Sequence, residues 1–170
     1  MQYSLPNALT IVRMLLALPF LVLLVAGETQ AALVILLLAA ATDLVDGKLA
    51  RLLNSITALG TQLDPFADKL LLLPATFWFA FTGAIPLWLA AVVVSRDALL
   101  AAVWFRTGRR METGLTGKVN TALHTAVVAA ATAMTFIVVP SLPAALMWLS
   151  YALAAVAGIS LLSYLVKMTR

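Results

Sequence analysis

The sequence predicts an all-α integral membrane protein with six transmembrane helices. Of its 170 residues, 64% are hydrophobic and only 11% are charged, whereas a soluble domain usually carries about 25% charged residues. The mean hydropathy is +1.06, and the apolar residues form long runs separated by short polar turns. The length favours one domain covering residues 1–170. The absence of cysteine excludes a disulfide scaffold and a thiolate metal site.

A short interfacial segment, residues 3–7, is expected to precede the first helix. Within it Pro6 sets a turn, and Asn7 is a good helix N-cap. The apolar runs and the turns between them predict helices over residues 9–26, 31–53, 57–81, 86–106 and 117–139, and a sixth that follows Pro143 and ends near residue 167. The first of these runs is just long enough to span a bilayer.

The distribution of Lys and Arg predicts the orientation. The connections at residues 27–30, 82–85 and 140–143 contain neither residue. Eight of the eleven basic residues lie instead beside the other turns and at the C-terminus: Lys48, Arg51, Arg106, Arg109, Arg110, Lys118, Lys167 and Arg170. By the positive-inside rule, both termini are cytoplasmic. We therefore expect a multi-pass protein of the cytoplasmic (inner) membrane.

Two pairs of acidic residues mark the candidate site. Asp43 and Asp46 are three residues apart, and Asp64 and Asp68 are four apart, so each pair shares one helix face. The short turn between their helices predicts antiparallel neighbours, on which the four carboxylates can converge. Carboxylates inside a membrane cost about 2.5–3.5 kcal/mol each. Bound Mg²⁺, Mn²⁺ or Ca²⁺ would offset that cost, because hard cations prefer oxygen ligands.

A structural ion pair is the simpler alternative for these acids. Arg51 or Lys69 could neutralise one of them. Four acids against two bases still leave net negative charge, which favours a bound cation. Gly47 and Gly60 lie near the acids, where a missing side chain lets a ligand approach closely. The site is expected to be a cavity that opens to the cytoplasmic side and to the lipid.

Further charges lie inside apolar runs at Arg13, Arg96 and Asp97. Intramembrane charges usually face the protein interior or a water-filled cavity. Arg96 could pair with Asp97 or another acid. Alternatively, an anion site beside the metals would be lined by Arg13, Arg96, Arg106, Lys118 and Arg109. A cationic pocket next to bound metal ions suits phosphoryl chemistry on a substrate with a lipid tail and a nucleotide head.

The acidic stretch also carries a family resemblance. It reads D-x2-D-G-x2-A-R-x8-G-x3-D-x3-D from Asp43 to Asp68 and resembles, at every fixed position, the signature of the CDP-alcohol phosphotransferase family. The resemblance implies phospholipid biosynthesis, in which an acceptor hydroxyl displaces CMP from CDP-diacylglycerol. It implies a two-metal site of Mg²⁺ or Mn²⁺ held by Asp43, Asp46, Asp64 and Asp68, with Asp68 also the general base. It further implies nucleotide binding by Gly47, Ala50, Arg51 and Gly60.

The resemblance implies an acceptor that is a phospholipid or a polyol phosphate. The segment from Pro6 to Arg13 resembles the opening of bacterial phosphatidylglycerophosphate and cardiolipin synthases. Asn120 stands where a Lys would be expected for glycerol 3-phosphate, and Arg96-Asp97 resembles the CMP-forming cardiolipin synthases. Phosphatidylglycerol is therefore the expected acceptor, and glycerol 3-phosphate is the alternative. The residues expected to bind acceptor or phosphate are Arg13, Arg96, Arg106, Lys118 and Asn120.

Two other classes of protein stay open. A divalent-cation transporter would also place acids among six spans, but it would need them near the midplane along a polar path. A non-catalytic scaffold would not need four carboxylates or the two small residues beside them. The small-residue patches at residues 39–41 and 154–158 suit helix packing within one chain or in a homodimer. No nucleic-acid partner is expected.

Overall fold

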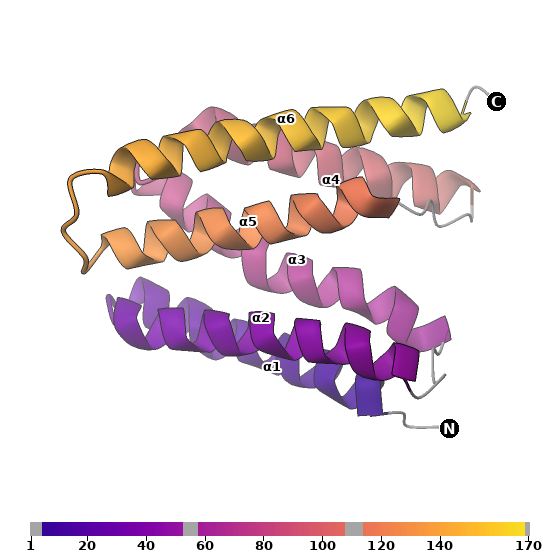
Figure 1. Ribbon diagram of the computed structural model, residues 1–170, viewed down its shortest axis with the longest axis horizontal. Coiled ribbons are helices and arrows are strands. Elements are labelled where there is room, and N and C mark those ends of the chain that lie inside the picture. Colours follow the sequence, from indigo (N-terminus) through magenta and orange to yellow (C-terminus); the bar gives the residue numbers. More distant parts are fainter. Residues whose placement is uncertain (1–4, 53–57, 108–113, 169–170) are drawn as a thin grey trace. The chain divides into compact units, whose positions relative to one another are not determined.

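The described part of the chain is entirely helical. The structure, a computed structural model, describes the backbone of residues 5–52, 58–107 and 114–168, and side chains at 10–42, 66–103, 106, 115–163 and 166. Over these residues the chain forms six helices and no strand, which confirms the all-α prediction (Figure 1). The helices are α1 Leu5–Val25, α2 Thr29–Leu52, α3 Ala58–Phe81, α4 Leu87–Thr107, α5 Gly114–Met134 and α6 Leu142–Met168.

The helices form two compact units. The first comprises Met1–Ala75 and Thr132–Val138, and the second comprises Thr76–Ala131 and Val139–Arg170. Helix α3 therefore contributes its first part to one unit and its end to the other. The expectation of a single domain over residues 1–170 stays a prediction.

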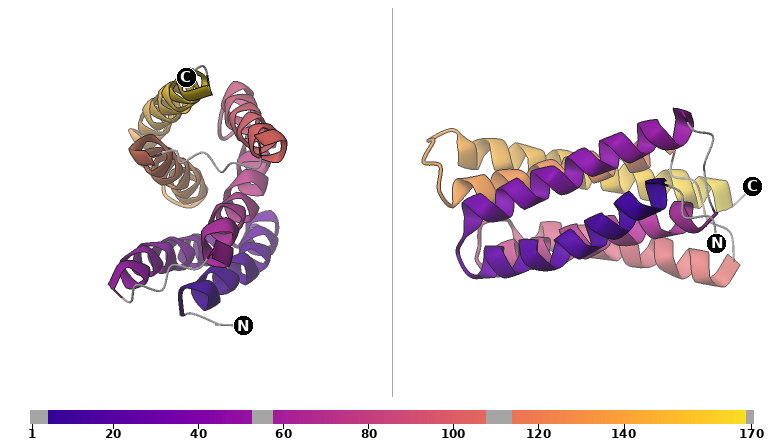
Figure 2. Two further views of the ribbon diagram at one scale, coloured as in Figure 1. Left: turned by 90° about the vertical axis from the view of Figure 1, so that its right-hand side faces the viewer. Right: turned by 90° about the horizontal axis from the view of Figure 1, so that it is seen from below.

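In the first unit, α1 packs against α2 (Figure 2). Their connection turns at Gly27, whose φ of 82° is a left-handed value that glycine adopts without strain. The Glu28 N–H donates to the Leu23 carbonyl at 2.9 Å, which satisfies a carbonyl that the ending helix would leave bare. The buried residues of α1 recur every three or four positions and so form one stripe: Thr10, Arg13, Ala17, Phe20 and Leu24.

In the second unit, α4 packs against α6. Trp88 of α4 stacks on Tyr151 of α6 with ring centroids 5.5 Å apart. Both helices also carry buried apolar side chains, namely Leu89, Ala90 and Val93 on α4, and Leu146, Leu153 and Ala157 on α6. A second contact joins the two helices where the Arg96 Nη2 of α4 donates to the Ser160 hydroxyl of α6 at 3.1 Å.

Three predicted helix boundaries, one in α1 and two in α5, differ from the structure by three residues or more. Helix α1 begins at Leu5, so Pro6 and Asn7 lie in its first turn and Asn7 is not the N-cap. Proline is favourable there because the first-turn N–H groups have no helical partner to lose. Helix α5 begins at Gly114 rather than at residue 117, and it ends at Met134 rather than near residue 139. The β-branched run before Pro140 disfavours helix, and the residue before a proline is pushed toward extended backbone.

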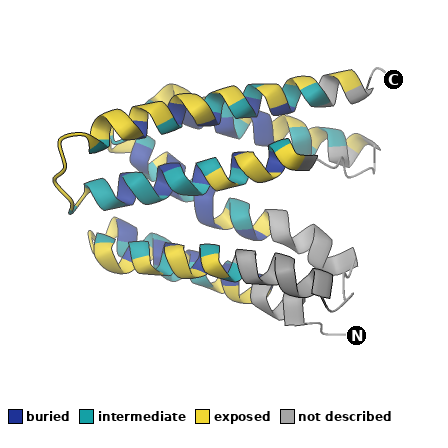
Figure 3. Ribbon diagram, viewed as in Figure 1, coloured by how far each residue is buried: buried dark blue, intermediate teal, exposed yellow. Residues whose placement is uncertain are grey.

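The apolar surface is extensive. Among the described residues, Leu142–Ser163 is a helix long and apolar enough to cross a membrane, and Thr10–Val25 and Thr29–Thr42 are shorter apolar helices. Buried and exposed residues alternate along α6 (Figure 3), and its Trp148 is 75% exposed. The six-span topology and the homodimer stay predictions.

Candidate active site

The two acid pairs lie on uninterrupted helices. Helix α2 continues through Asp43 and Asp46, and α3 continues through Asp64 and Asp68. The helical spacing that places each pair on one face is therefore present in the backbone. Of the four side chains, only that of Asp68 is described. The convergence of all four carboxylates stays a prediction.

The predicted nucleotide-binding residues belong to the same two helices. Gly47, Ala50 and Arg51 follow the first acid pair on α2, and Gly60 precedes the second pair on α3. All four fall outside the residues whose side chains are described, and Arg109 falls outside the described backbone as well. Their roles stay predictions.

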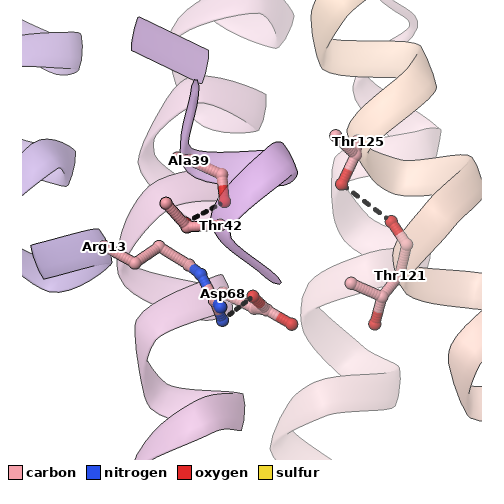
Figure 4. Close-up of polar contacts among 6 residues, drawn as sticks. All are labelled: Arg13, Ala39, Thr42, Asp68, Thr121 and Thr125. Atoms are coloured by element: carbon pink, nitrogen blue, oxygen red, sulfur yellow. Dashed lines mark hydrogen bonds and ion pairs between the residues drawn. The ribbon is translucent and has the colours of Figure 1, made fainter. Parts of the chain in front are cut away.

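Asp68 pairs with Arg13. The Arg13 Nη1 of α1 donates to the Asp68 Oδ1 of α3 at 3.3 Å, across 55 positions of sequence (Figure 4). The Arg13 side chain is only 1% exposed, whereas that of Asp68 is 26% exposed. The carboxylate thus has a buried cation on one side and an accessible surface on another. This geometry leaves Asp68 reachable by a ligand or a metal ion while its orientation is restrained.

Arg96 forms a second buried ion pair within the other unit. Its Nη1 donates to the Asp97 Oδ1 at 2.8 Å, and its Nη2 donates to the Ser160 hydroxyl of α6 at 3.1 Å. The pairing of Arg96 with its neighbour, one of the two alternatives drawn from the sequence, is confirmed. A guanidinium committed to these two partners links α4 to α6. Its predicted role in binding the acceptor stays a prediction.

A line of polar side chains follows the buried face of α5. The His124 Nε2 and the hydroxyl of Thr76 on α3 lie 2.6 Å apart, so one hydrogen bond joins the two helices. One turn earlier, Asn120 is 4% exposed. Its Oδ1 is a buried acceptor without a hydrogen-bond partner in the described part of the chain. An unmatched buried acceptor is costly, and a ligand that donates a hydroxyl would satisfy it.

The two other predicted cations with described side chains, Arg106 and Lys118, are exposed. Arg106 lies in the last turn of α4 and Lys118 in the second turn of α5, both in the same unit as Arg96 and Asn120. Arg13 belongs to the other unit, with Asp68. Among the predicted site residues whose side chains are described, the structure shows one ion pair, between Arg13 and Asp68. The single anion site expected from the sequence stays a prediction.

Asp68 fits a metal site by its chemistry. Its carboxylate supplies the oxygen donors that Mg²⁺ and Mn²⁺ prefer, and its partial exposure leaves room for water or phosphate on the ion. Among the described side chains no group of three or more His, Cys, Asp or Glu gathers to hold an ion. The three other acids of the predicted site are outside that set. The candidate ligands therefore remain Asp43, Asp46, Asp64 and Asp68.

Two polar residues of this architecture were not singled out from the sequence. Thr76 and Ser160 lie in apolar helices and bond to His124 and Arg96, respectively. Isolated hydroxyl residues usually bond to the carbonyl one turn back in their own helix, as Ser150 does here with Leu146. The available signal was that each is a hydroxyl residue that interrupts a long apolar run, which marks a polar group in need of a partner but does not identify that partner.

The chain belongs to the CDP-alcohol phosphatidyltransferase family, whose model matches residues 3–156. The match covers nearly the whole chain and confirms the resemblance carried by the acidic stretch. The fold described above is thus that of a family member in which the signature begins in the C-terminal half of α2 and ends in the first half of α3.

The relatives are named as two kinds of enzyme, cardiolipin synthases and a glycerol-3-phosphate 3-phosphatidyltransferase. A putative cardiolipin synthase of Mycobacterium bovis is 32% identical over 123 residues, which are 69% of this chain and 59% of that protein. The CMP-forming cardiolipin synthase of Streptomyces coelicolor is 44% identical over 69 residues, 41% of this chain and 32% of that protein. The CDP-diacylglycerol–glycerol-3-phosphate 3-phosphatidyltransferase of Bacillus subtilis is 31% identical over 138 residues, 71% of this chain and 72% of that protein. The chain spans about three fifths of the mycobacterial relative.

Proposed function

We propose that this protein is a metal-dependent membrane enzyme of phospholipid biosynthesis. It transfers the phosphatidyl group of CDP-diacylglycerol to an acceptor hydroxyl and releases CMP. The observation that carries this proposal is the pair of acid-bearing helices, α2 and α3, with a partly exposed Asp68 held against the buried Arg13. Membership of the family, together with the names of the relatives, supports the same reaction.

In the proposed reaction Asp68 acts as the general base. Its carboxylate accepts the proton of the acceptor hydroxyl, and the hydroxyl oxygen attacks the phosphorus that carries diacylglycerol. A new P–O bond forms to the acceptor, and the bond from this phosphorus to the bridging oxygen breaks. CMP leaves with that electron pair, and Asp68 returns its proton to solvent. A positioned base of this kind contributes about 10²–10⁴-fold to a rate.

Asp43, Asp46, Asp64 and Asp68 would hold the Mg²⁺ or Mn²⁺ ions. When bound, these ions neutralise charge on the pyrophosphate and on the leaving CMP. The nucleotide would bind beside these acids on the same two helices. The residues that would bind it are Gly47, Ala50 and Arg51 on α2 and Gly60 on α3. The signature that these positions match supports the assignment.

Phosphatidylglycerol is the proposed acceptor. Glycerol 3-phosphate brings a dianion, whereas phosphatidylglycerol brings a phosphodiester with one charge. The charge of Arg96 is already matched by Asp97, and Asn120 offers a neutral amide. Charge-assisted hydrogen bonds are about twice as strong as neutral ones, so these residues suit the acceptor of lower charge. Relatives carry the names of both kinds of synthase, which keeps glycerol 3-phosphate as the second candidate.

We expect purified full-length protein to make cardiolipin from labelled CDP-diacylglycerol and phosphatidylglycerol. Each acceptor is supplied alone with Mg²⁺, and lipid products are identified by mass. The matched variant Asn120→Lys adds a cation to the buried face of α5, so it should shift relative turnover toward glycerol 3-phosphate. Efficient turnover of wild type with glycerol 3-phosphate and none with phosphatidylglycerol would reverse the choice of acceptor and leave the donor assignment intact.

We further propose six transmembrane spans with both termini and the acid pairs on the cytoplasmic side of the inner membrane. The apolar helix Leu142–Ser163 and the two shorter apolar helices support membrane insertion. The absence of Lys and Arg from the three opposite turns supports the orientation.

Single-cysteine labelling tests this topology cleanly, because the native chain has no cysteine. In intact spheroplasts, a membrane-impermeant maleimide should label Ser141→Cys, which lies in the turn before α6. The same reagent should label Arg109→Cys only after permeabilisation. Labelling of Arg109→Cys from outside intact spheroplasts would contradict the topology and the cytoplasmic site together.

A further inference from the structure

We infer that Arg13 is a positioning residue that fixes the Asp68 carboxylate for metal binding, rather than a group that binds acceptor or substrate phosphate. This inference rests on the proposed function of Asp68 as a metal ligand and base. It replaces the role that the sequence suggested for Arg13. The guanidinium reaches across from α1 to α3 and contacts Asp68 Oδ1 through Nη1 at 3.3 Å (Figure 4).

The burial of Arg13 favours a role in positioning Asp68 over a role in binding phosphate. The residue lies in the middle of the stripe through which α1 packs, one turn from Thr10 on one side and from Ala17 on the other. Its side chain is 1% exposed. A guanidinium enclosed in this way has no accessible surface to offer a phosphate, and close packing restricts its movement. Asp68 carries the accessible surface of the pair, so a ligand that approaches this pair meets the Asp68 carboxylate rather than the Arg13 guanidinium.

Stability alone does not account for this pair. A buried ion pair costs desolvation and is often no more stable than well-packed apolar residues of similar volume. Here the Asp68 side chain remains 26% exposed, whereas a residue that served only to pack the helices together would be buried. A cation that hydrogen-bonds to one oxygen of a ligating carboxylate restricts its rotamer, which is the usual function of groups just outside a metal's own ligands.

The two roles predict opposite effects on metal affinity. Removing a positive charge 3.3 Å from a ligand should, by electrostatics alone, tighten the binding of a divalent cation. Loss of a positioning group instead weakens binding, typically by about 10–100-fold. Weaker metal binding after loss of the Arg13 charge would therefore indicate a positioning role, and this measurement does not require catalytic turnover.

The test measures binding of Mn²⁺ alone to the full-length protein in detergent, by electron paramagnetic resonance of the free ion. Arg13→Gln is expected to weaken Mn²⁺ binding by about 10–100-fold. Arg13→Met, whose unbranched apolar side chain suits the buried stripe, should show the same loss and serves if the Gln variant does not fold. Arg13→Lys keeps a cation that can still reach a carboxylate, so it should recover part of the affinity.

A second measurement checks that Arg13 acts through Asp68. In an Asp68→Asn background, Arg13→Gln should cause no further loss of Mn²⁺ affinity. Unchanged or tighter Mn²⁺ binding in both neutral Arg13 variants would overturn the inference, as would a raised KM for CDP-diacylglycerol with Mn²⁺ affinity intact. Either result would leave the proposed reaction standing. Wild-type protein that releases no CMP, but binds Mn²⁺ in an Arg13-dependent way, would instead refute the reaction alone.

Discussion

Asp68→Asn is expected to lower CMP release from CDP-diacylglycerol by at least about 10²–10⁴-fold, the contribution of a positioned general base. Asparagine keeps the size of the side chain but removes both the charge that balances Mg²⁺ and the ability to take a proton. Asp43→Asn and Asp64→Asn should also abolish metal-dependent release, because each removes one carboxylate ligand. Turnover is measured as labelled CMP at saturating Mg²⁺ with phosphatidylglycerol present.

Glu28→Gln is the matched control for these acid variants. Glu28 is exposed at the turn between α1 and α2. Its substitution by Gln removes one negative charge, as the aspartate variants do, but at a position outside the signature. It should retain wild-type turnover. Near wild-type turnover in any of the three aspartate variants would remove the metal or base assignment of that residue.

Arg96→Met is expected to destabilise the folded protein by about 3–5 kcal/mol, the usual cost of removing one partner of a buried ion pair. Asp97 is only 11% exposed and would lose the guanidinium that neutralises it at 2.8 Å. The link from α4 to α6 through Ser160 would be lost as well. Thermal unfolding in detergent, followed by circular dichroism, measures the change.

Two control variants separate the charge from the hydrogen bond. Ser160→Ala removes the neutral acceptor of one charge-assisted hydrogen bond and should cost about 1.5–3 kcal/mol. The double variant Arg96→Met/Asp97→Leu removes both charges and should regain much of the stability lost in Arg96→Met. If Arg96→Met is no less stable than Ser160→Ala, the Arg96–Asp97 ion pair within α4 contributes no stability beyond the hydrogen bond that links α4 to α6.

Local sequence patterns predicted the features that depend on nearby residues. The acid pairs were identified because helical spacing of three and four residues is visible in the sequence and the backbone of α2 and α3 is continuous there. The Arg96–Asp97 pair was available as an alternative because its partners are adjacent in the chain. The end of α5 was missed, because apolar composition continues to residue 139 while the backbone preferences before Pro140 do not favour helix.

Contacts between distant residues were not predictable in this way. Arg13 and Asp68 are 55 positions apart, and the contact depends on how α1 packs against α3. From the sequence, Arg13 was grouped with the other cations as a phosphate ligand, because a charge in an apolar run predicts a partner without identifying it. The hydrogen bond between Thr76 and His124 was not predictable for the same reason, because its partners are 48 positions apart.

The central claim is that the acid-bearing helices hold metal ions that support transfer from CDP-diacylglycerol. Its most direct test is CMP release by the purified full-length protein, with phosphatidylglycerol as acceptor, in Mg²⁺ and after chelation. We predict release in Mg²⁺ or Mn²⁺, none after chelation, and recovery when the metal is restored. Failure to release CMP with phosphatidylglycerol or glycerol 3-phosphate in either metal, or release that chelation does not change, would contradict the claim.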